Sequence, residues 1–228
     1  MDERTPYDRI NKHGIQGFLY SFLRGTDYED YHDKGSFKFF TFSDIFPLGD
    51  FEPNKVKSLL VSSPDDDFIL TLRDSIHSRD GQGILEGHNI YILNCKVIRA
   101  QVSGRFISAS PIVLYENSRN NLYYSFNRNK SLSFFLERLK ENAMKKYKAY
   151  YEEDLNLEGN IFDKLVFRKE VAVRLSKEGR TFIVIGSVWR LLEKFKISKD
   201  EEKFYGFIMD CGLGEKNSLG FGFINPLR

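Results

Sequence analysis

The first half of the chain opens with an apolar stripe at helical spacing. The stripe consists of Ile15, Phe18, Leu19, Phe22 and Leu23. Apolar residues three and four positions apart predict an amphipathic helix. Thr5 stands where a helix cap is expected, Pro6 at the first helical position and Gly25 just past the end. The pattern therefore predicts a first helix that begins near Pro6 and ends before Gly25.

Strand patterns follow this helix. Residues 36–43 are rich in phenylalanine and predict a strand, and residues 67–73 predict another because their side chains alternate in type. We expect a short helix near 74–80 and a further strand over 88–99. The first half thus predicts the order helix, strand, strand, helix, strand.

The second half shows a fuller alternation of strands and helices. The predicted elements are a strand at 110–115, a helix at 131–150, strands at 164–175 and 181–192, a helix at 199–210 and a strand at 220–225. Strand–helix–strand–strand–helix–strand is the ferredoxin-like order. We therefore predict an α+β protein of two tandem ferredoxin-like (RRM-like) domains, residues 1–102 and 103–228, the first lacking its opening strand.

Composition excludes several classes of protein. With 228 residues, 41% of them hydrophobic and 15% aromatic, the chain can bury two cores. Cys95 and Cys211 are isolated, so they predict neither a disulfide framework nor a structural zinc. No apolar run approaches the roughly 20 residues of a membrane helix, and the N-terminus does not resemble a signal peptide. We expect a cytoplasmic protein with no cofactor, no metal and no membrane partner.

Charge is divided unequally along the chain, although its net value is only +2. Residues 1–90 hold 10 Lys and Arg against 16 Asp and Glu, a net −6. Residues 91–228 hold 24 against 16, a net +8. A positive second half suits a polyanionic partner such as a nucleic acid.

Residues 212–222, which we call the glycine loop, form the most informative motif. Its glycines are Gly212, Gly214, Gly220 and Gly222. Glycine adopts positive φ without penalty, so the run predicts a tight loop whose backbone N–H groups suit phosphate oxygens. The polar residues expected at its tip are Lys216, Asn217 and Ser218. No Gly-Lys-Ser/Thr tripeptide opens a helix here, which excludes a nucleotide P-loop. A glycine-rich hairpin without a ligand is the alternative.

Three segments in this order carry a resemblance to a known family. They are His32-Asp33-Lys34-Gly35 followed by Phe39-Phe40-Thr41-Phe42-Ser43, then Ser110-Pro111-Ile112-Val113-Leu114, then the glycine loop. They resemble the histidine loop, the second-domain strand and the signature loop of CRISPR-associated RNA-processing proteins of the RAMP superfamily. The resemblance spans about Thr5 to Ile224. It implies a metal-independent endoribonuclease that cuts CRISPR repeat RNA within precursor transcripts and so gives mature guide RNAs.

Two other functions stay open. A noncatalytic RNA-binding RAMP subunit of a CRISPR effector complex would keep the glycine loop without a functional histidine. A ferredoxin-like domain for small ligands or protein assembly is a third alternative, which the positive second half disfavours. CRISPR repeat RNA is the expected partner, and an effector complex is a further candidate partner.

Metal-independent RNA cleavage uses the substrate's own 2′-hydroxyl as nucleophile, while the protein transfers protons and stabilises the charged phosphorane. The resemblance implies that His32 transfers a proton. It implies Lys38 as the cation beside the phosphorane and Tyr20, on the first helix, as a partner of the histidine. The alternatives are His13 for the base and Tyr28 and Tyr31 for the tyrosine.

A basic hairpin is the second predicted RNA-binding feature. The turn between the two long strands contains Lys177 and Arg180, and the strand before it contains Arg168 and Arg174. Such a hairpin can bind phosphates along an RNA stem. Residues 128–148 are also rich in Lys and Arg, but a solvated helix face is the more usual explanation for such a run.

The start of the chain departs from the family pattern. The family usually has a strand before its first helix, and here only a few residues precede Pro6. We expect the first domain to re-pair its remaining strands or to borrow an edge from a second copy as a homodimer. A longer native N-terminus is the third alternative.

Overall fold

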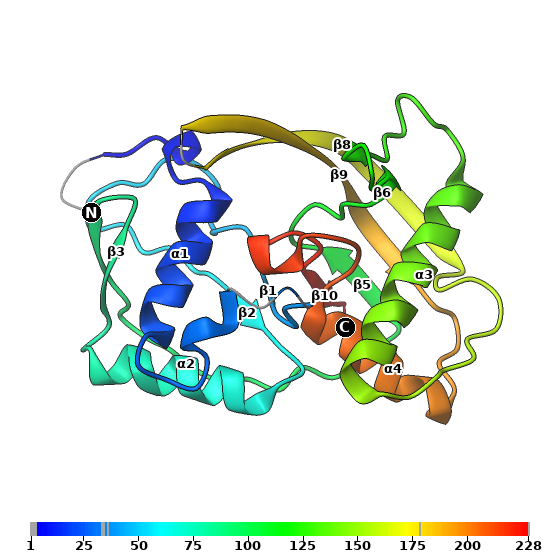
Figure 1. Cartoon of the computed structure of the whole chain (residues 1–228), viewed down its shortest axis with the longest axis horizontal. Coiled ribbons are helices and arrows are strands. Elements are labelled where there is room, and N and C mark those ends of the chain that lie inside the picture. The colour runs from blue at the N-terminus through cyan, green and yellow to red at the C-terminus, as the bar shows by residue number, and fades with distance from the viewer. Residues whose placement is uncertain (1–3, 33–34, 36, 178, 228) are drawn as a thin grey trace.

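The chain folds into two lobes (Figure 1), each built on its own hydrophobic core. The computed structural model describes residues 4–32, 35, 37–177 and 179–227, without the side chains of His32 and Lys177. One core uses residues between Ile10 and Leu85, and the other uses residues between Phe106 and Ile224. The domain boundary at 102/103 lies between these cores and stays a prediction. No helix in the described part of the chain combines the length and apolar character that a membrane crossing needs.

The second domain has the ferredoxin-like topology. Its elements are β5 (Arg105–Ser108), α3 (Leu132–Tyr151), β8 (Lys164–Lys177), β9 (Arg180–Glu193), α4 (Lys199–Cys211) and β10 (Ile224–Pro226). The strands are antiparallel and lie in the order β10-β5-β9-β8. The helices pack against this sheet, where Phe135 of α3 lies 5.1 Å from Trp189 of β9 between ring centroids. A small hairpin, β6 (Tyr115–Asn117) and β7 (Leu122–Tyr123), lies beside the sheet.

The structure confirms both predicted helices and the two long strands of this domain to within two residues. The prediction of an opening strand at 110–115 was wrong, because β5 precedes that segment. Ile112 forms only an isolated bridge with Ser187, and Pro111 beside it has no N–H to donate to a ladder. The last strand begins at Ile224 and not at 220, because Gly220 and Gly222 have φ of 76° and 72°.

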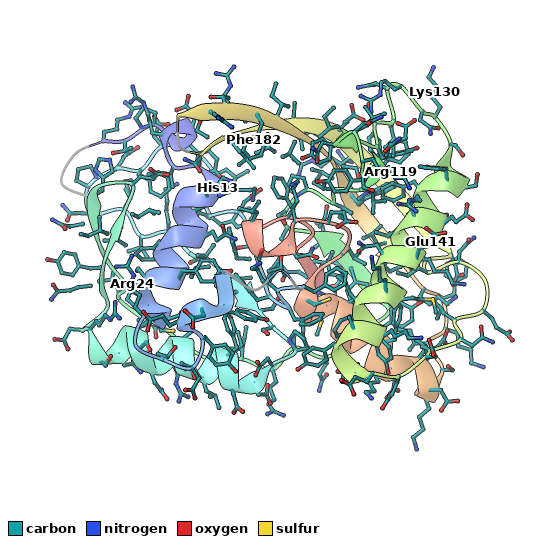
Figure 2. All side chains as sticks on the ribbon, in the orientation of Figure 1. His13, Arg24, Arg119, Lys130, Glu141 and Phe182 are labelled. Atoms are coloured by element: carbon teal, nitrogen blue, oxygen red, sulfur yellow. The ribbon has the colours of Figure 1, made fainter. Side chains whose placement is uncertain are left out.

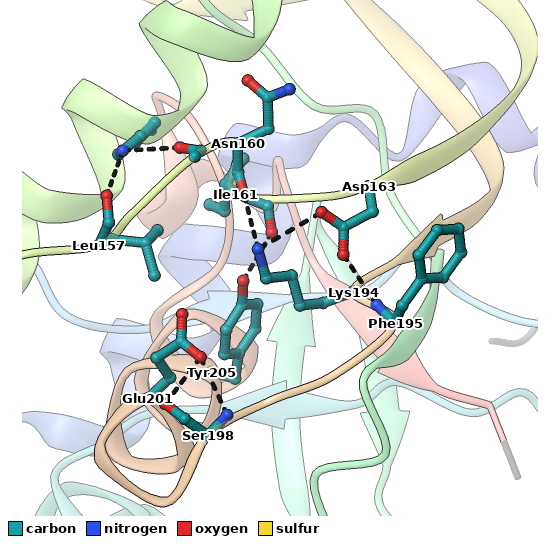
Figure 3. Close-up of polar contacts among 11 residues, drawn as sticks. Leu157, Asn160, Ile161, Asp163, Lys194, Phe195, Ser198, Glu201 and Tyr205 are labelled. Atoms are coloured by element: carbon teal, nitrogen blue, oxygen red, sulfur yellow. Dashed lines mark hydrogen bonds and ion pairs between the residues drawn. The ribbon is translucent and has the colours of Figure 1, made fainter.

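The connection from α3 to β8 is fixed by side chains that donate to its backbone (Figure 3). Lys140 Nζ donates to the carbonyls of Leu157 and Gly159, and Lys194 Nζ donates to that of Asn160. The Tyr205 hydroxyl donates to Ile161 O at 2.7 Å. The two lysines therefore hold this connection in place.

The described residues of the first domain form two α-helices and two short antiparallel ladders. Its elements are α1 (Lys12–Leu23), β1 (Thr41–Phe42), β2 (Val61–Ser62), α2 (Asp66–Ser78), β3 (Gln82–Leu85) and β4 (His88–Tyr91). β1 pairs with β2 and β3 pairs with β4. No strand precedes α1 among the described residues, where Thr5 forms an isolated bridge with Phe51. After α1 the order is strand, strand, helix and the β3–β4 hairpin, which is the ferredoxin-like order without its opening strand and with one additional strand at the end.

Several predictions for this domain were wrong in detail. The segment 67–73 is helical: Phe68, Leu72 and Ile76 are buried at a spacing of four residues, and Asp65 caps the helix by accepting from Phe68 N. The first helix is capped by Asn11 and not by Thr5, because the Asn11 side chain accepts from the N–H groups of His13 and Gly14. The predicted strands at 36–43 and 88–99 shorten to β1 and β4, and β3 was missed.

The β8–β9 hairpin extends beyond its own domain and reaches α1 (Figures 1 and 2). Near its tip, Phe182 meets His13 edge to face, with ring centroids 5.9 Å apart. Leu175 and Val184 on the same part of the hairpin are buried against Phe221 of the glycine loop. The hairpin therefore lies over the loop and contacts both domains.

Buried polar groups hold the glycine loop from within. Lys146 Nζ, on α3, donates to Gly212 O at 2.6 Å, Gly214 O at 3.1 Å and Asn217 Oδ1 at 2.8 Å. The Asn217 amide donates in turn to Leu213 O and Phe221 O, both at 3.0 Å. Asn217 is 7% exposed, so its predicted position at an exposed tip was wrong. Burial lowers the pKa of Lys146, and the three oxygen acceptors compensate its ammonium group.

The outer side of the glycine loop docks on the first domain. Lys12 Nζ, at the start of α1, donates to Gly220 O at 2.7 Å and to Asp44 Oδ1 at 2.6 Å. Gln16 Nε2 donates to Ser218 O at 2.8 Å, and Thr41 Oγ1 donates to Phe221 O at 3.0 Å. The loop is therefore the hydrogen-bonded contact between α1 and the second domain.

We expect Gly222→Ala to destabilise the protein more than Gly159→Ala. Both glycines have left-handed backbones, with φ of 72° and 65°, which costs a residue with a Cβ about 1–2 kcal/mol. A Cβ at 222 would also lie 1.8 Å from Leu213 O, whereas a Cβ at 159 would meet no atom within 4 Å. Thermal and denaturant unfolding measure the difference. Equal losses would show that the loop can relax around the methyl group.

Candidate active site and RNA-binding surface

A pocket of about 680 Å³ lies between α1, the 3₁₀ turn η2 (Glu29–His32) and the glycine loop. Its lining residues are His13, Gln16, Gly17, Tyr20, Ser21, Arg24, Glu29, Asp30, Lys38, Ser218 and Leu219. Two predicted catalytic residues, Tyr20 and Lys38, and one predicted RNA-binding residue, Ser218, therefore share one cavity. The fold brings the last of these from almost 200 residues further along the chain.

One face of α1 supplies most of the pocket wall. The lining residues of α1 and its C-cap are His13, Gln16, Gly17, Tyr20, Ser21 and Arg24, and steps of three or four from Tyr20 lead to Gln16, Gly17 and Arg24. The opposite face carries the apolar stripe, which is buried in the first core. Sequence reasoning missed Gln16 and Arg24, although counting by three and four from Tyr20 would have found them.

Two of the predicted catalytic residues, Tyr20 and His32, belong to elements that form the pocket wall. The Tyr20 ring packs edge to face on the buried Phe40, with centroids 5.8 Å apart. The backbone of His32 ends η2, the turn whose Glu29 and Asp30 line the pocket. The His32 side chain lies outside the described residues, so its role stays a prediction.

The alternative tyrosines are engaged elsewhere. The Tyr28 hydroxyl donates to Asp65 Oδ2 at 2.8 Å, and the Tyr31 hydroxyl accepts from Phe39 N at 2.9 Å. Burial raises the pKa of both hydroxyls. Both rings pack against the first core, and neither lines the pocket. Tyr20 is therefore the tyrosine that the geometry favours.

Of the histidines whose side chains are described, His13 lines the pocket and the others lie outside it. His13 therefore stays the alternative base. His77 is exposed on α2, and His88 Nε2 lies 3.4 Å from Thr5 Oγ1. Within the described ranges, no three His, Cys, Asp or Glu side chains gather as a potential metal site.

The polar residues of the glycine loop point in three directions. Ser218 lines the pocket, and Asn217 lies inside the loop. Lys216 turns toward the β6–β7 hairpin, where its Nζ lies 5.7 and 5.8 Å from the ring centroids of Tyr115 and Tyr123. Only part of the predicted RNA-binding loop is therefore available to a ligand.

The arginines of the β8–β9 hairpin are exposed. Arg168, Arg174 and Arg180 make no ion pair or hydrogen bond with any described side chain. Arg174 lies opposite Ile183 in the ladder, and Arg180 lies opposite Lys177 at the turn. The Lys177 side chain is outside the described part. Unpaired guanidinium groups keep their capacity to bind phosphate.

The basic residues of α3 are mostly engaged within the protein, and Lys146 is buried, so only part of this run fits a solvated helix face. Arg138 pairs with Glu141 at 2.7 Å, and Lys148 pairs with Asp154 at 2.8 Å. Lys140 and Lys146 donate to backbone carbonyls. Figure 2 shows Glu141 and Lys130 in the lobe of α3, away from His13 on α1 and Arg24 at its C-terminal end.

The pocket therefore combines groups suited to phosphate chemistry. The phenol of Tyr20 can donate a hydrogen bond, and the ammonium of Lys38 can stabilise a negative oxygen. Exposed arginines on the nearby hairpin and Lys216 add positive charge around the glycine loop. A phosphodiester in the pocket would meet Tyr20, Lys38 and Ser218, whereas Lys216 and the hairpin arginines lie outside the pocket lining.

Residues 94–226, more than half of the chain, match the family described as CRISPR associated protein Cas6, C-terminal. A protein of Methanocaldococcus jannaschii named CRISPR-associated endoribonuclease Cas6 2 is 47% identical over 97% of this chain and 94% of its own length. This coverage extends the match through the first domain.

Solved structures share the whole fold. One described as CRISPR associated protein Cas6 has a TM-score of 0.70 at 24% identity, covering 100% of this chain and 95% of its own. Another, described as an RAMP protein binding different RNA substrates, has a TM-score of 0.69 at 18% identity, with coverage of 100% and 95%. The fold of two tandem ferredoxin-like domains and the resemblance drawn from the three sequence segments are both confirmed. The chain belongs to the CRISPR-associated Cas6 family.

Proposed function

We propose that this protein is an endoribonuclease that cleaves CRISPR repeat RNA within precursor transcripts and so produces guide RNAs. The observation that carries the proposal is the pocket shared by Tyr20, Lys38 and the glycine loop. The relative that is 47% identical is named an endoribonuclease, and a protein of the same fold is described as binding RNA. A noncatalytic RNA-binding subunit would not need a tyrosine and a lysine facing one cavity.

The reaction that suits these residues is attack of a ribose 2′-oxygen on the adjacent phosphorus. A new O2′–P bond forms and the P–O5′ bond breaks, which leaves a 2′,3′-cyclic phosphate and a 5′-hydroxyl. His32 removes the 2′-hydroxyl proton, and Tyr20 hydrogen-bonds to the reacting group. Lys38 stabilises the negative charge of the phosphorane. Tyr20 gives the leaving 5′-oxygen a proton as the P–O5′ bond breaks, and the proton that His32 took up returns to Tyr20 through solvent.

RNA binds across both domains in this proposal. Lys216 and Ser218 contact the strand at the glycine loop, where Gly212, Gly214, Gly220 and Gly222 shape the backbone. Arg168, Arg174, Lys177 and Arg180 contact phosphates along the β8–β9 hairpin. Because the hairpin lies over the loop and reaches His13, an RNA bound along it leads toward the pocket.

We expect repeat RNA to be cut at a discrete position in the presence of EDTA, because the proposed proton transfers use only protein side chains and the RNA. A 2′-deoxyribose just upstream of the cut should block cleavage and leave binding intact. End-group analysis should find a 5′-hydroxyl and a cyclic or opened 3′-phosphate. Efficient cleavage of the deoxy substrate would overturn the mechanism.

We expect His32→Ala to slow single-turnover cleavage by about 10²-fold or more, the lower range for a lost acid or base. Tyr20→Phe and Lys38→Ala should also slow the chemical step. RNA affinity should change little in all three variants. His77→Ala, an exposed histidine outside the pocket, is the matched control. Full activity of His32→Ala together with loss in His13→Ala would reassign the base.

We expect Arg174→Ala and Arg180→Ala each to make RNA binding less dependent on salt. Losing one phosphate contact lowers the slope of log K against log salt by about 0.7–0.9, because fewer counterions are released. Lys55→Ala, an exposed cation of the first domain, should leave that slope unchanged. An unchanged slope in the two hairpin variants would place the RNA elsewhere.

A further inference from the structure

We propose that Tyr115, Tyr123 and Lys216 form a subsite that stacks one nucleobase of the RNA strand and binds its phosphate. This inference rests on the proposed function. It adds a binding site for a nucleotide that lies outside the cleaved phosphodiester. Nothing in the sequence patterns singled out either tyrosine.

The two tyrosines form a preorganised aromatic pair. Tyr115 and Tyr123 are directly opposite in the β6–β7 ladder. Their rings are stacked, with centroids 5.0 Å apart and planes 20° apart. Both side chains are partly exposed. A paired, nearly parallel arrangement costs little further ordering when a third planar group stacks on it.

Lys216 brings a positive charge to this pair without a carboxylate to neutralise it. Its Nζ is almost equidistant from the two rings, at 5.7 and 5.8 Å. In the described structure it forms no ion pair, and its neighbour Glu215 accepts from the Asn142 amide. Cation–π contact leaves the ammonium its full charge. Burial raises the pKa of the Tyr123 hydroxyl, and the nearby Lys216 opposes that shift.

The cluster is continuous with the pocket. Lys216 has a left-handed backbone, with φ of 60°, and begins the 3₁₀ turn η3 (Asn217–Leu219). Ser218 and Leu219 of that turn line the pocket. The same short turn thus presents one edge to the reacting groups and the other to the aromatic pair. A strand that leaves the pocket along the loop would reach Lys216 next.

A cation beside aromatic faces is the arrangement that binds single-stranded nucleic acid without reading its sequence. Stacking on an aromatic side chain contributes about 1–3 kcal/mol per base, and the ammonium binds the adjoining phosphate. The subsite therefore acts on affinity and on retention of the strand. It does not touch the reacting atoms and is not catalytic.

The test measures binding of a noncleavable repeat RNA, 2′-deoxy at the cut, by fluorescence anisotropy. Tyr115→Leu should raise Kd about fivefold or more, the factor that corresponds to the lower stacking energy. Tyr115→Phe keeps the aromatic ring and should bind like the wild type. Tyr91→Leu, an exposed tyrosine on β4, is the matched control. Tyr91→Leu should leave both the Kd and the cleavage rate at saturating protein unchanged.

A scan of single abasic sites along the RNA identifies the stacked base. One abasic position should weaken wild-type binding and cause no further loss in Tyr115→Leu. Unchanged affinity of Tyr115→Leu, or losses that simply add at every abasic position, would overturn the subsite. Failure of the wild type to cut the ribose form, with the abasic coupling intact, would instead overturn the proposed reaction and leave the subsite standing.

Discussion

The buried carbonyl groups of the glycine loop need hydrogen-bond donors, because water does not reach them. The way this need is met organises the protein. The glycine loop meets it with two buried ammonium groups that approach from opposite sides. Lys146 donates to carbonyls inside the loop, and Lys12 donates to Gly220 O from the first domain. Burial lowers the pKa of both lysines, and for Lys12 the nearby Asp44 carboxylate opposes that shift. Removing either cation would leave buried oxygens without donors.

Helix α1 connects the hydrogen bonds of the glycine loop with the candidate catalytic pocket. Its first residue docks the glycine loop, its apolar face belongs to the core, and its polar face lines the pocket with His13 and Tyr20. The position of Tyr20 relative to Ser218 is therefore fixed by packing and by hydrogen bonds at two points along one helix. A catalytic geometry built on a rigid element needs less ordering when the substrate arrives.

The sequence predicted what local patterns determine. The helices α3 and α4 and the strands β8 and β9 carry clear stripes and a turn signal, and they lie where expected. The segment 67–73 carries a pattern that a strand and a helix both satisfy, and packing of Phe68 on the first core decides for the helix. Family resemblance led to Tyr20 and Lys38, which share the pocket, while the role of His32 is still to be tested.

The interior of the glycine loop was beyond sequence reasoning. Asn217 turns inward because Lys146, which lies 71 residues earlier, offers it a donor. No local pattern reveals such a partner. The aromatic pair of Tyr115 and Tyr123 meets Lys216 for the same reason, since the contact exists only after the second domain has folded.

The glycine loop contains two kinds of residue: buried residues that fix its shape and partly exposed residues that face outward. Its buried positions are Gly212, Leu213, Gly214, Asn217, Gly220, Phe221 and Gly222, whereas Glu215, Lys216, Ser218 and Leu219 are partly exposed. A substitution at Lys216 or Ser218 can alter what the surface recognises without disturbing the buried frame. Such a division lets a protein acquire a preference for a different RNA by a few mutations, each of which leaves a folded chain.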